Sequence, residues 1–381
     1  MKELLVVPQI DSYETFAAFA AAAKIGEGDL ILTNEYIYDP LMKAENLSCR
    51  YIFQEKYGAG EPTDRMVDSI LAEMNREKCL RVFAIGGGTI LDIGKILTLK
   101  DAENVDALYE RSELEKGREL YLIPTTCGTG SEMTNISIVN RTRKGTKMGL
   151  TSPAMFADHA VLIPEFLRTL PYYVFATSSI DALIHGIEAY LSPNSTSYTD
   201  MYGAAAIEII LSGYCRIARE GQDARFAESE AYLRASNYAG IAFGNAGCAA
   251  VHAMSYALGA KYHVPHGESN YQFLTSVLRK YQEKKPKGKL ERLNALLLRA
   301  LKQDSRTDVE AEDVADGIAA LERLLAAILK PKAMKEYGAV QEDIPEFAAS
   351  TVANQQRLLK NNYVELSLEE IQELYQERLN G

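Results

Sequence analysis

A short apolar run leads directly into three glycines and then into a segment with helical periodicity. The run Arg81–Ile85 has the character of a buried strand, and Gly86, Gly87 and Gly88 follow it. Glycine lets the backbone approach a phosphate closely because it has no Cβ. The start of the helix after it offers free N–H groups and a partial positive charge. This strand–turn–helix unit predicts an anion-binding turn, although a tight turn without a ligand has the same pattern.

Further strands and helices alternate on both sides of this unit. Strand-like runs occupy Asp29–Thr33, Tyr51–Glu55 and Leu120–Ile123, and Thr63–Met74 and Thr89–Leu99 have helical periodicity. Such alternation predicts a parallel, doubly wound sheet. The later segment Thr134–Leu150 predicts a hairpin whose polar turn is Arg141–Gly145.

Long helical segments dominate the second half of the chain. They are Ser179–Tyr190, Tyr198–Arg219, Ala227–Tyr238 and Val309–Leu329. The stretch Ala239–Ala260 contains no charged residue, and we interpret it as a buried helix, since its polar residues and glycines argue against a membrane span. We therefore predict an α/β Rossmann-like N-terminal domain at residues 1–177 and an all-α C-terminal domain at residues 178–381.

Composition excludes several classes of protein. The net charge of -11 over 381 residues argues against nucleic-acid binding, which needs a basic surface. Five cysteines, an odd number with no CxxC pair, argue against a disulfide framework. The first residues have no apolar signal segment. We expect a soluble cytoplasmic protein that acts on a small molecule, with no membrane contact.

A second polar loop follows the strand Leu120–Ile123. It runs from Pro124 to Glu132 and contains Thr125, Thr126 and Thr129. In open α/β sheets ligands bind at the carboxyl ends of the strands, where this loop and the glycine turn would meet. The threonine hydroxyls could instead cap the next turn, and such capping is compatible with ligand binding.

Four potential metal ligands lie in the helical half of the chain. Asp181 and His185 are spaced i, i+4 on one helical face, His252 lies in the charge-free stretch, and His266 follows a proline. One carboxylate and three imidazoles suit Fe(II) or Zn(II). An Asp–His ion pair and a buried core histidine are the alternative interpretations, and spacing alone does not show that the four residues meet.

Four motifs in order along the chain resemble the iron-containing (group III) alcohol dehydrogenases. They are GGGT with Asp92 and Lys95, PTTCGTGSE at 124–132, DALIHGIEAY at 181–190 and VHAMSYALGAKYHVPHGE at 251–268. Within that family, ILTNE at 31–35, SNYAGIAFGNAG at 236–247 and LLKNNY at 358–363 resemble the 4-hydroxybutyrate dehydrogenases.

The resemblance implies a role for each matching residue. Asp181, His185, His252 and His266 would bind the metal, and the turn at Gly86–Thr89 would hold the pyrophosphate of NAD through Gly87, Gly88 and Thr89. The rest of the nicotinamide nucleotide site would be formed by Asp92, Thr125, Thr126, Thr129 and Lys147. From the residues alone, Lys147 and its basic neighbours in the hairpin turn are expected to be solvated.

Three positions depart from the family pattern. Asn34 stands where many relatives have an aspartate that binds the adenosine ribose, so NAD is favoured over NADP only weakly. Tyr256 replaces a histidine four residues after the third expected ligand, and His263 is an additional histidine. We expect Tyr256 and His263 to share the catalytic roles of proton relay or contact with a substrate carboxylate, although a structural role for His263 is an equal alternative.

The predicted activity is NAD-dependent oxidation of a short alcohol, most specifically of 4-hydroxybutanoate to succinate semialdehyde. Alternatives are another short-chain alcohol or diol dehydrogenase of the family and a lyase of the dehydroquinate synthase type that uses NAD transiently. A non-redox metallohydrolase and a catalytically silent nucleotide-binding module are further alternatives. A homodimer is expected because it is common among such enzymes.

Overall fold

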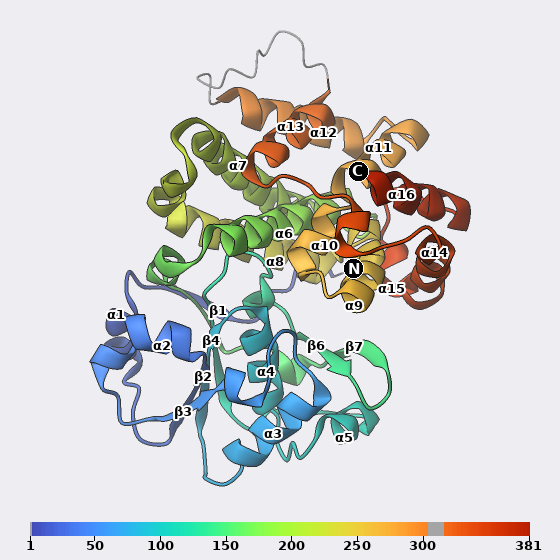
Figure 1. Cartoon of the computed structure of the whole chain (residues 1–381). Coiled ribbons are helices and arrows are strands. Elements are labelled where there is room, and N and C mark those ends of the chain that lie inside the picture. Colours follow the sequence, from blue (N-terminus) through green and yellow to red (C-terminus); the bar gives the residue numbers. More distant parts are fainter. Residues whose placement is uncertain (1, 304–315) are drawn as a thin grey trace. The chain divides into compact units, whose positions relative to one another are not determined.

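The chain consists of two compact units (Figure 1). The computed structural model describes residues 2–303 and 316–381. One unit comprises Val6–Leu170, and the other comprises Pro171–Gly381 together with the segment that precedes Val6. That segment contacts the helical unit, since Leu5 exchanges hydrogen bonds with the side chain of Asn245. The expected boundary between residues 177 and 178 lies inside helix α6 (Tyr172–Leu191).

Six parallel strands form the sheet of the first unit. Their spatial order is β1 (Gln9–Ser12), β8 (His159–Leu162), β5 (Glu119–Pro124), β4 (Arg81–Gly86), β2 (Asp29–Thr33) and β3 (Arg50–Phe53). Strands β4 and β5 pair along their whole length, with Gly86 opposite Pro124. The loops that leave these two strands therefore start side by side at the carboxyl edge of the sheet.

Alternate residues of the strands build two separate cores. Leu32, Ala84 and Leu122 pack in one core, with helices α3 (Asp64–Met74), α4 (Gly88–Leu97) and α5 (Val105–Glu110). Phe83 and Ile123 point into the other, with α1 (Phe16–Ala23) and α2 (Glu35–Leu41). Successive side chains of a strand point to opposite faces, so helices cover both faces of the sheet. The predicted doubly wound α/β fold is confirmed.

The predicted hairpin forms an antiparallel pair, β6 (Ile136–Arg141) and β7 (Thr146–Thr151). The expectation of a solvated turn is wrong for Arg141 but not for Arg143, which stays exposed. Arg141 is buried and pairs with Asp106 at 2.6 Å, and Arg143 pairs with Asp68 at 2.7 Å. Carboxylates from α3 and α5, distant in sequence, neutralise the basic turn, and the local pattern contains no sign of them.

The second unit is all helical, as predicted. Its α-helices are α6 (Tyr172–Leu191), α7 (Ser197–Glu220), α8 (Ser229–Ala246), α9 (Ala250–Tyr262), α10 (His266–Tyr271), α11 (Leu274–Lys284), α12 (Lys289–Gln303), α13 (Gly317–Ile328), α14 (Asp343–Asn354), α15 (Gln356–Leu359) and α16 (Leu368–Asn380). The expected helix Val309–Leu329 corresponds to α13, and its residues 309–315 lie outside the described part of the chain.

The charge-free stretch Ala239–Ala260 is not one helix. It contains the end of α8 and most of α9, separated at residues 247–249. Gly247 ends α8 with a φ of 83°, a conformation that side chains other than glycine rarely adopt. Among the described residues, none of the helices is both long and apolar enough to span a bilayer.

Candidate functional site

Helix α6 carries the first two candidate ligands inside the helical unit. It is buried on nearly all sides, as expected for a helix that is apolar around most of its circumference. Asp181 and His185 are 2% and 4% exposed. His185 Nδ1 lies 3.9 Å from Asp181 Oδ2, so the i, i+4 spacing places both groups on one face as predicted.

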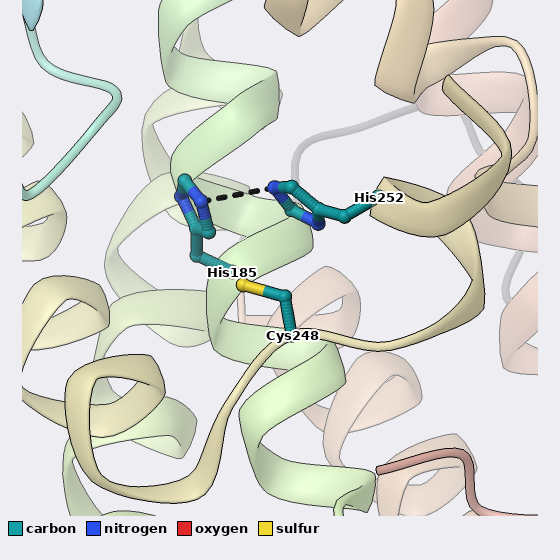
Figure 2. Close-up of side chains that lie close together, drawn as sticks. All are labelled: His185, Cys248 and His252. Atoms are coloured by element: carbon teal, nitrogen blue, oxygen red, sulfur yellow. Dashed lines mark hydrogen bonds between the residues drawn. The ribbon is translucent and has the colours of Figure 1, made fainter. Parts of the chain in front are cut away.

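Helices α9 and α10 bring the other two imidazoles to this face. His252 Nε2 lies 3.7 Å from Asp181 Oδ1. It also lies 3.0 Å from His185 Nε2, the contact drawn in Figure 2. His266 Nε2 lies 3.9 Å from Asp181 Oδ1. Gly267 allows α10 to approach α6, because a Cβ there would lie 2.2 Å from the carbonyl oxygen of Thr177. The structure therefore places the four predicted ligands in two groups that share His252: Asp181 with His252 and His266, and His185 with His252 and a cysteine.

The spacing of these donor atoms fits a divalent cation. Ligands at about 2.1 Å from a tetrahedral metal are separated from one another by about 3.4 Å. His252 Nε2 and His266 Nε2 lie 3.7 and 3.9 Å from Asp181 Oδ1, somewhat beyond that value, and the donor atoms of these three residues are all within 4.8 Å of one another. Burial alone would raise the pKa of Asp181, but His185, His266 and His252 outweigh it and lower that pKa.

Glu188 orients His252 from the side opposite the ligand cluster. Its carboxylate accepts hydrogen bonds from His252 Nδ1 at 2.6 Å and from the backbone N–H groups of Ala249 and Val251 at 3.0 and 2.7 Å. It thereby fixes the start of α9 and leaves Nε2 directed at His185. The sequence prediction missed Glu188, although it follows His185 by three residues and so lies near the same helical face.

Two other side chains at the cluster were also missed. Cys248 lies in the break between α8 and α9, and its thiol forms a group with His185 and His252 whose ligand atoms are within 4.8 Å of one another (Figure 2). Asn270 donates to Asp181 Oδ1 at 2.7 Å, and its own buried Oδ1 has no hydrogen-bond partner in the described part of the chain. Only the unexpected helix break places Cys248 here, so no local spacing predicts it.

The two residues expected to have catalytic roles differ in their surroundings. Tyr256 lies one helical turn after His252, and its ring centroid is 6.4 Å from that of His266. His263 ends α9 with a φ of 54° and is exposed. Its imidazole has no hydrogen bond or ion pair with any described residue. The fifth histidine, His159, stacks on Tyr121 in the α/β unit and is no part of the cluster.

The glycine turn and the threonine loop meet in the α/β unit. A Cβ on Gly88 would lie 2.9 Å from the methyl carbon of Thr129, so the two loops touch there. A Cβ on Gly87 would meet nothing closer than Thr126, at 3.6 Å. The backbone at Gly87, which caps α4, is therefore open to a ligand. Space at a helix N-terminus fits a phosphate.

Other residues predicted to bind the nucleotide already contact protein groups. Asp92 accepts hydrogen bonds from Ser131 Oγ at 2.7 Å and Ile138 N at 2.8 Å, which gives it a structural role. Lys147 pairs with Glu61 at 2.7 Å instead of being solvated, and Thr89 donates to the carbonyl of Gly60. The buried Thr125 continues from β5, with its N–H bonded to Gly86 O. Contacts with a nucleotide stay predictions for these residues.

Asn34 begins helix α2 at the carboxyl end of β2 and is buried. Its side-chain amide donates to Gln54 Oε1 at 3.0 Å and to Glu55 Oε2 at 2.8 Å. A carboxylate therefore lies beside the position at which relatives have an aspartate. The sequence prediction treated Asn34 as neutral and did not detect the charge that Glu55 supplies.

Comparison with known proteins assigns the family. The family "Iron-containing alcohol dehydrogenase" matches residues 18–164, and its C-terminal counterpart matches residues 175–379. The chain belongs to the iron-containing alcohol dehydrogenases. It is 46% identical over 376 residues to the 4-hydroxybutyrate dehydrogenase of Clostridium kluyveri, covering 98% of this chain and 99% of that one.

More distant relatives agree with this assignment. The probable alcohol dehydrogenase EutG of Escherichia coli is 33% identical over 319 residues, covering 83% of this chain and 77% of that protein. The crystal structure of sulfoacetaldehyde reductase from Bifidobacterium kashiwanohense in complex with NAD+ has a TM-score of 0.82 and 20% identity. It covers 100% of this chain and 99% of that one, and supports the fold.

Proposed function

We propose that this chain is a metal-dependent NAD(H) alcohol dehydrogenase that interconverts 4-hydroxybutanoate and succinate semialdehyde. The observation that carries the proposal is the gathering of Asp181, His185, His252 and His266 in a member of the iron-containing alcohol dehydrogenases. The substrate is inferred from the 46% identity to a 4-hydroxybutyrate dehydrogenase across almost the full length of both chains.

In this proposal Fe(II), or Zn(II), is held by the carboxylate and the three imidazoles. A divalent cation in such a site supplies Lewis acidity that lowers the pKa of an alcohol hydroxyl or polarises a carbonyl. Glu188 keeps the Nε2 lone pair of His252 available by accepting from Nδ1. Asn270 orients one oxygen of Asp181 through its side-chain amide. These contacts hold the ligands in place before a substrate arrives.

The α/β unit is proposed to bind NAD at the glycine turn. The backbone at Gly87 and Gly88 and the N-terminus of α4 would hold the pyrophosphate, and the threonine loop would extend the site. NAD supplies the hydride acceptor, so oxidation of the alcohol yields the aldehyde, NADH and one proton. Glu55, next to Asn34, would repel a 2′-phosphate, which supports NAD over NADP.

The decisive experiment combines metal analysis with NADH turnover. We expect about one Fe(II) or Zn(II) per chain, and steady NADH formation with 4-hydroxybutanoate that stops in chelator and returns with metal. A lyase of the dehydroquinate synthase type would show no net change in NADH. Full activity in chelator, or turnover of no short alcohol by metal-loaded enzyme, would refute the proposal.

Location and assembly are further parts of the proposal. None of the five cysteines forms a disulfide, which supports a reducing compartment and hence the cytoplasm. A homodimer is proposed because closed two-fold assemblies are the commonest among oligomeric enzymes. Light scattering after size-exclusion chromatography would give the mass directly, and a mass near the 42.2 kDa of one chain would refute the dimer.

A further inference from the structure

The short helix α15 packs directly against α9, which carries His252. Leu358 forms an apolar cluster with Cys248 and Ala253, and Leu359 and Tyr256 pack against it. Asn361, which follows α15, donates to the carbonyl oxygen of Cys248 at 2.9 Å. The segment around residues 357–361 is therefore attached to the wall of the metal-ligand cluster, within the same structural unit.

This attachment places a guanidinium group beside Tyr256. Arg357 Nη2 donates to the hydroxyl of Tyr256 at 3.2 Å, and its Cζ lies 6.0 Å from the centroid of that ring. The ring of Tyr256 is in turn 6.4 Å from that of His266. One aromatic side chain thus separates a cation from a candidate metal ligand.

No carboxylate of the described residues neutralises the charge of Arg357. The side chain is exposed, and it forms no ion pair with any carboxylate among residues 2–303 and 316–381. Arg216, in contrast, pairs with two glutamates of the same unit. A guanidinium has five N–H donors in a planar fork, which suits a carboxylate, and a phenol hydroxyl accepts and donates at once.

We propose that Arg357 and Tyr256 bind the terminal carboxylate of a short ω-hydroxy acid. The inference rests on the proposed function, because it assumes that the hydroxyl end of the substrate lies at the metal ligands. Four bonds of about 1.5 Å separate the hydroxyl oxygen of extended 4-hydroxybutanoate from its carboxylate carbon, a span of about 5 Å. That span is comparable with the 6.4 Å between the rings of His266 and Tyr256.

The same geometry disfavours His263 as the carboxylate partner. His263 ends α9 in a left-handed conformation and is exposed, and no described residue holds its imidazole in place. Tyr256 lies one helical turn after His252 and packs against the apolar cluster that contains Leu358. A preorganised pair binds an anion more tightly than a solvated side chain that must first be ordered.

Substrate preference in two variants tests the proposal. Arg357→Gln should lower kcat/KM for 4-hydroxybutanoate by about 10- to 100-fold, mainly through KM, because a charged hydrogen bond to the carboxylate is lost. The kcat/KM for 1-butanol, which has no carboxylate, should stay within about threefold by the same reasoning. Tyr256→Phe should have a smaller effect in the same direction. The neighbouring Lys360→Gln changes the net charge by the same amount and should leave kcat/KM for both substrates unchanged.

Reversal of the charge provides a gain-of-function test. Arg357→Glu should turn over 4-amino-1-butanol, which carries a cation in place of the carboxylate, better than the unaltered enzyme does. Arg357→Lys should recover part of the activity with 4-hydroxybutanoate. Equal losses for 4-hydroxybutanoate and 1-butanol, or no loss for either, would overturn the assignment of Arg357.

A binding measurement separates this proposal from the proposed function. Butanoate has the carboxylate but no hydroxyl. Its NMR signals should broaden in the presence of the zinc-loaded unaltered enzyme, because it binds, and should stay sharp with the zinc-loaded Arg357→Gln variant. If the unaltered enzyme oxidises no alcohol, the proposed function fails, and butanoate binding still tests the subsite. If it oxidises 4-hydroxybutanoate while butanoate binds both forms equally, only the subsite is wrong.

Discussion

Glu188 accepts a hydrogen bond from Nδ1 of His252 at 2.6 Å, and this contact decides which ring nitrogen faces the cluster. The proton on Nδ1 leaves the lone pair on Nε2, which lies 3.7 Å from Asp181 and 3.0 Å from His185. Ligating imidazoles commonly donate their second N–H to a carboxylate, which raises ligand basicity and fixes the ring. Here the carboxylate comes from the helix that also carries two of the candidate ligands.

Glu188→Gln is expected to weaken metal binding without unfolding the protein. The amide keeps the shape of the side chain but loses the charge and one acceptor, so metal affinity should fall about 10- to 100-fold. Competition with a coloured chelator measures that affinity independently of turnover. Glu230→Gln, on the exposed surface of α8, is the matched control. Unchanged affinity in Glu188→Gln would show that the carboxylate only fixes the start of α9.

His266→Ala is expected to lose the metal and the dehydrogenase activity while the helical unit stays folded. His266 is more exposed than the other three candidate ligands, with a third of its side chain accessible, so its removal leaves only a small cavity. Metal content after dialysis, NADH turnover and circular dichroism together test this. A variant that keeps stoichiometric metal through dialysis would remove His266 from the set.

Local periodicity accounts for most of the fold, because strands and helices repeat with periods of about 2.0 and 3.6 residues. It predicted β4, α4 and the hairpin, and it identified Asp181 and His185 as neighbours on one face. It did not predict β1 or β8. It also did not predict the break at Gly247, which depends on a single backbone angle.

Contacts between distant segments account for what the sequence analysis missed. Glu55 supplies a carboxylate beside Asn34, and Arg357 lies about a hundred residues after Tyr256. Arg141 is buried because Asp106 neutralises it. No pattern within one helix or strand contains these pairs, so charge and burial at such positions follow from the tertiary structure.

Substitution by alanine is expected to have different effects at two glycines of the nucleotide turn. In Gly87→Ala the added Cβ finds ordinary contact with Thr126 at 3.6 Å, so stability should change little. The methyl group would occupy the space proposed for the pyrophosphate and lower NADH affinity about tenfold or more, equivalent to about 1.4 kcal/mol.

Gly86→Ala serves as the contrasting variant. Its Cβ would lie 2.4 Å from Ile90 Cγ1 and 2.6 Å from Ile90 Cβ, which forces β4 and α4 apart. Such overpacking costs about 1–3 kcal/mol of unfolding free energy. Fluorescence titration with NADH and thermal unfolding distinguish the two effects. Unaltered NADH affinity in a stable Gly87→Ala protein would argue against this turn as the pyrophosphate site.

Asp64 is expected to make the stability of the α/β unit depend on pH. Its buried carboxylate accepts from Thr142 Oγ1 at 2.6 Å and from the backbone of Arg143 at 3.0 Å, which ties α3 to the hairpin turn. Burial alone would raise the pKa of Asp64, but these bonds and that from Arg65 outweigh it and hold the pKa below 3.8. The stabilisation is thus fully present above pH 3.8 and is lost as the pH falls through the lowered pKa.

Asp64→Asn tests this dependence. At pH 7 the variant should lose about 2–3 kcal/mol of unfolding free energy, because hydrogen bonds to a charged carboxylate are removed. The difference from the unaltered protein should shrink below pH 3.8, where Asp64 itself becomes protonated. Thermal unfolding between pH 7 and pH 3 measures it, with the exposed Asp39→Asn as control. A difference that stays constant or widens in acid would mean that the charge of Asp64 does not stabilise the hairpin.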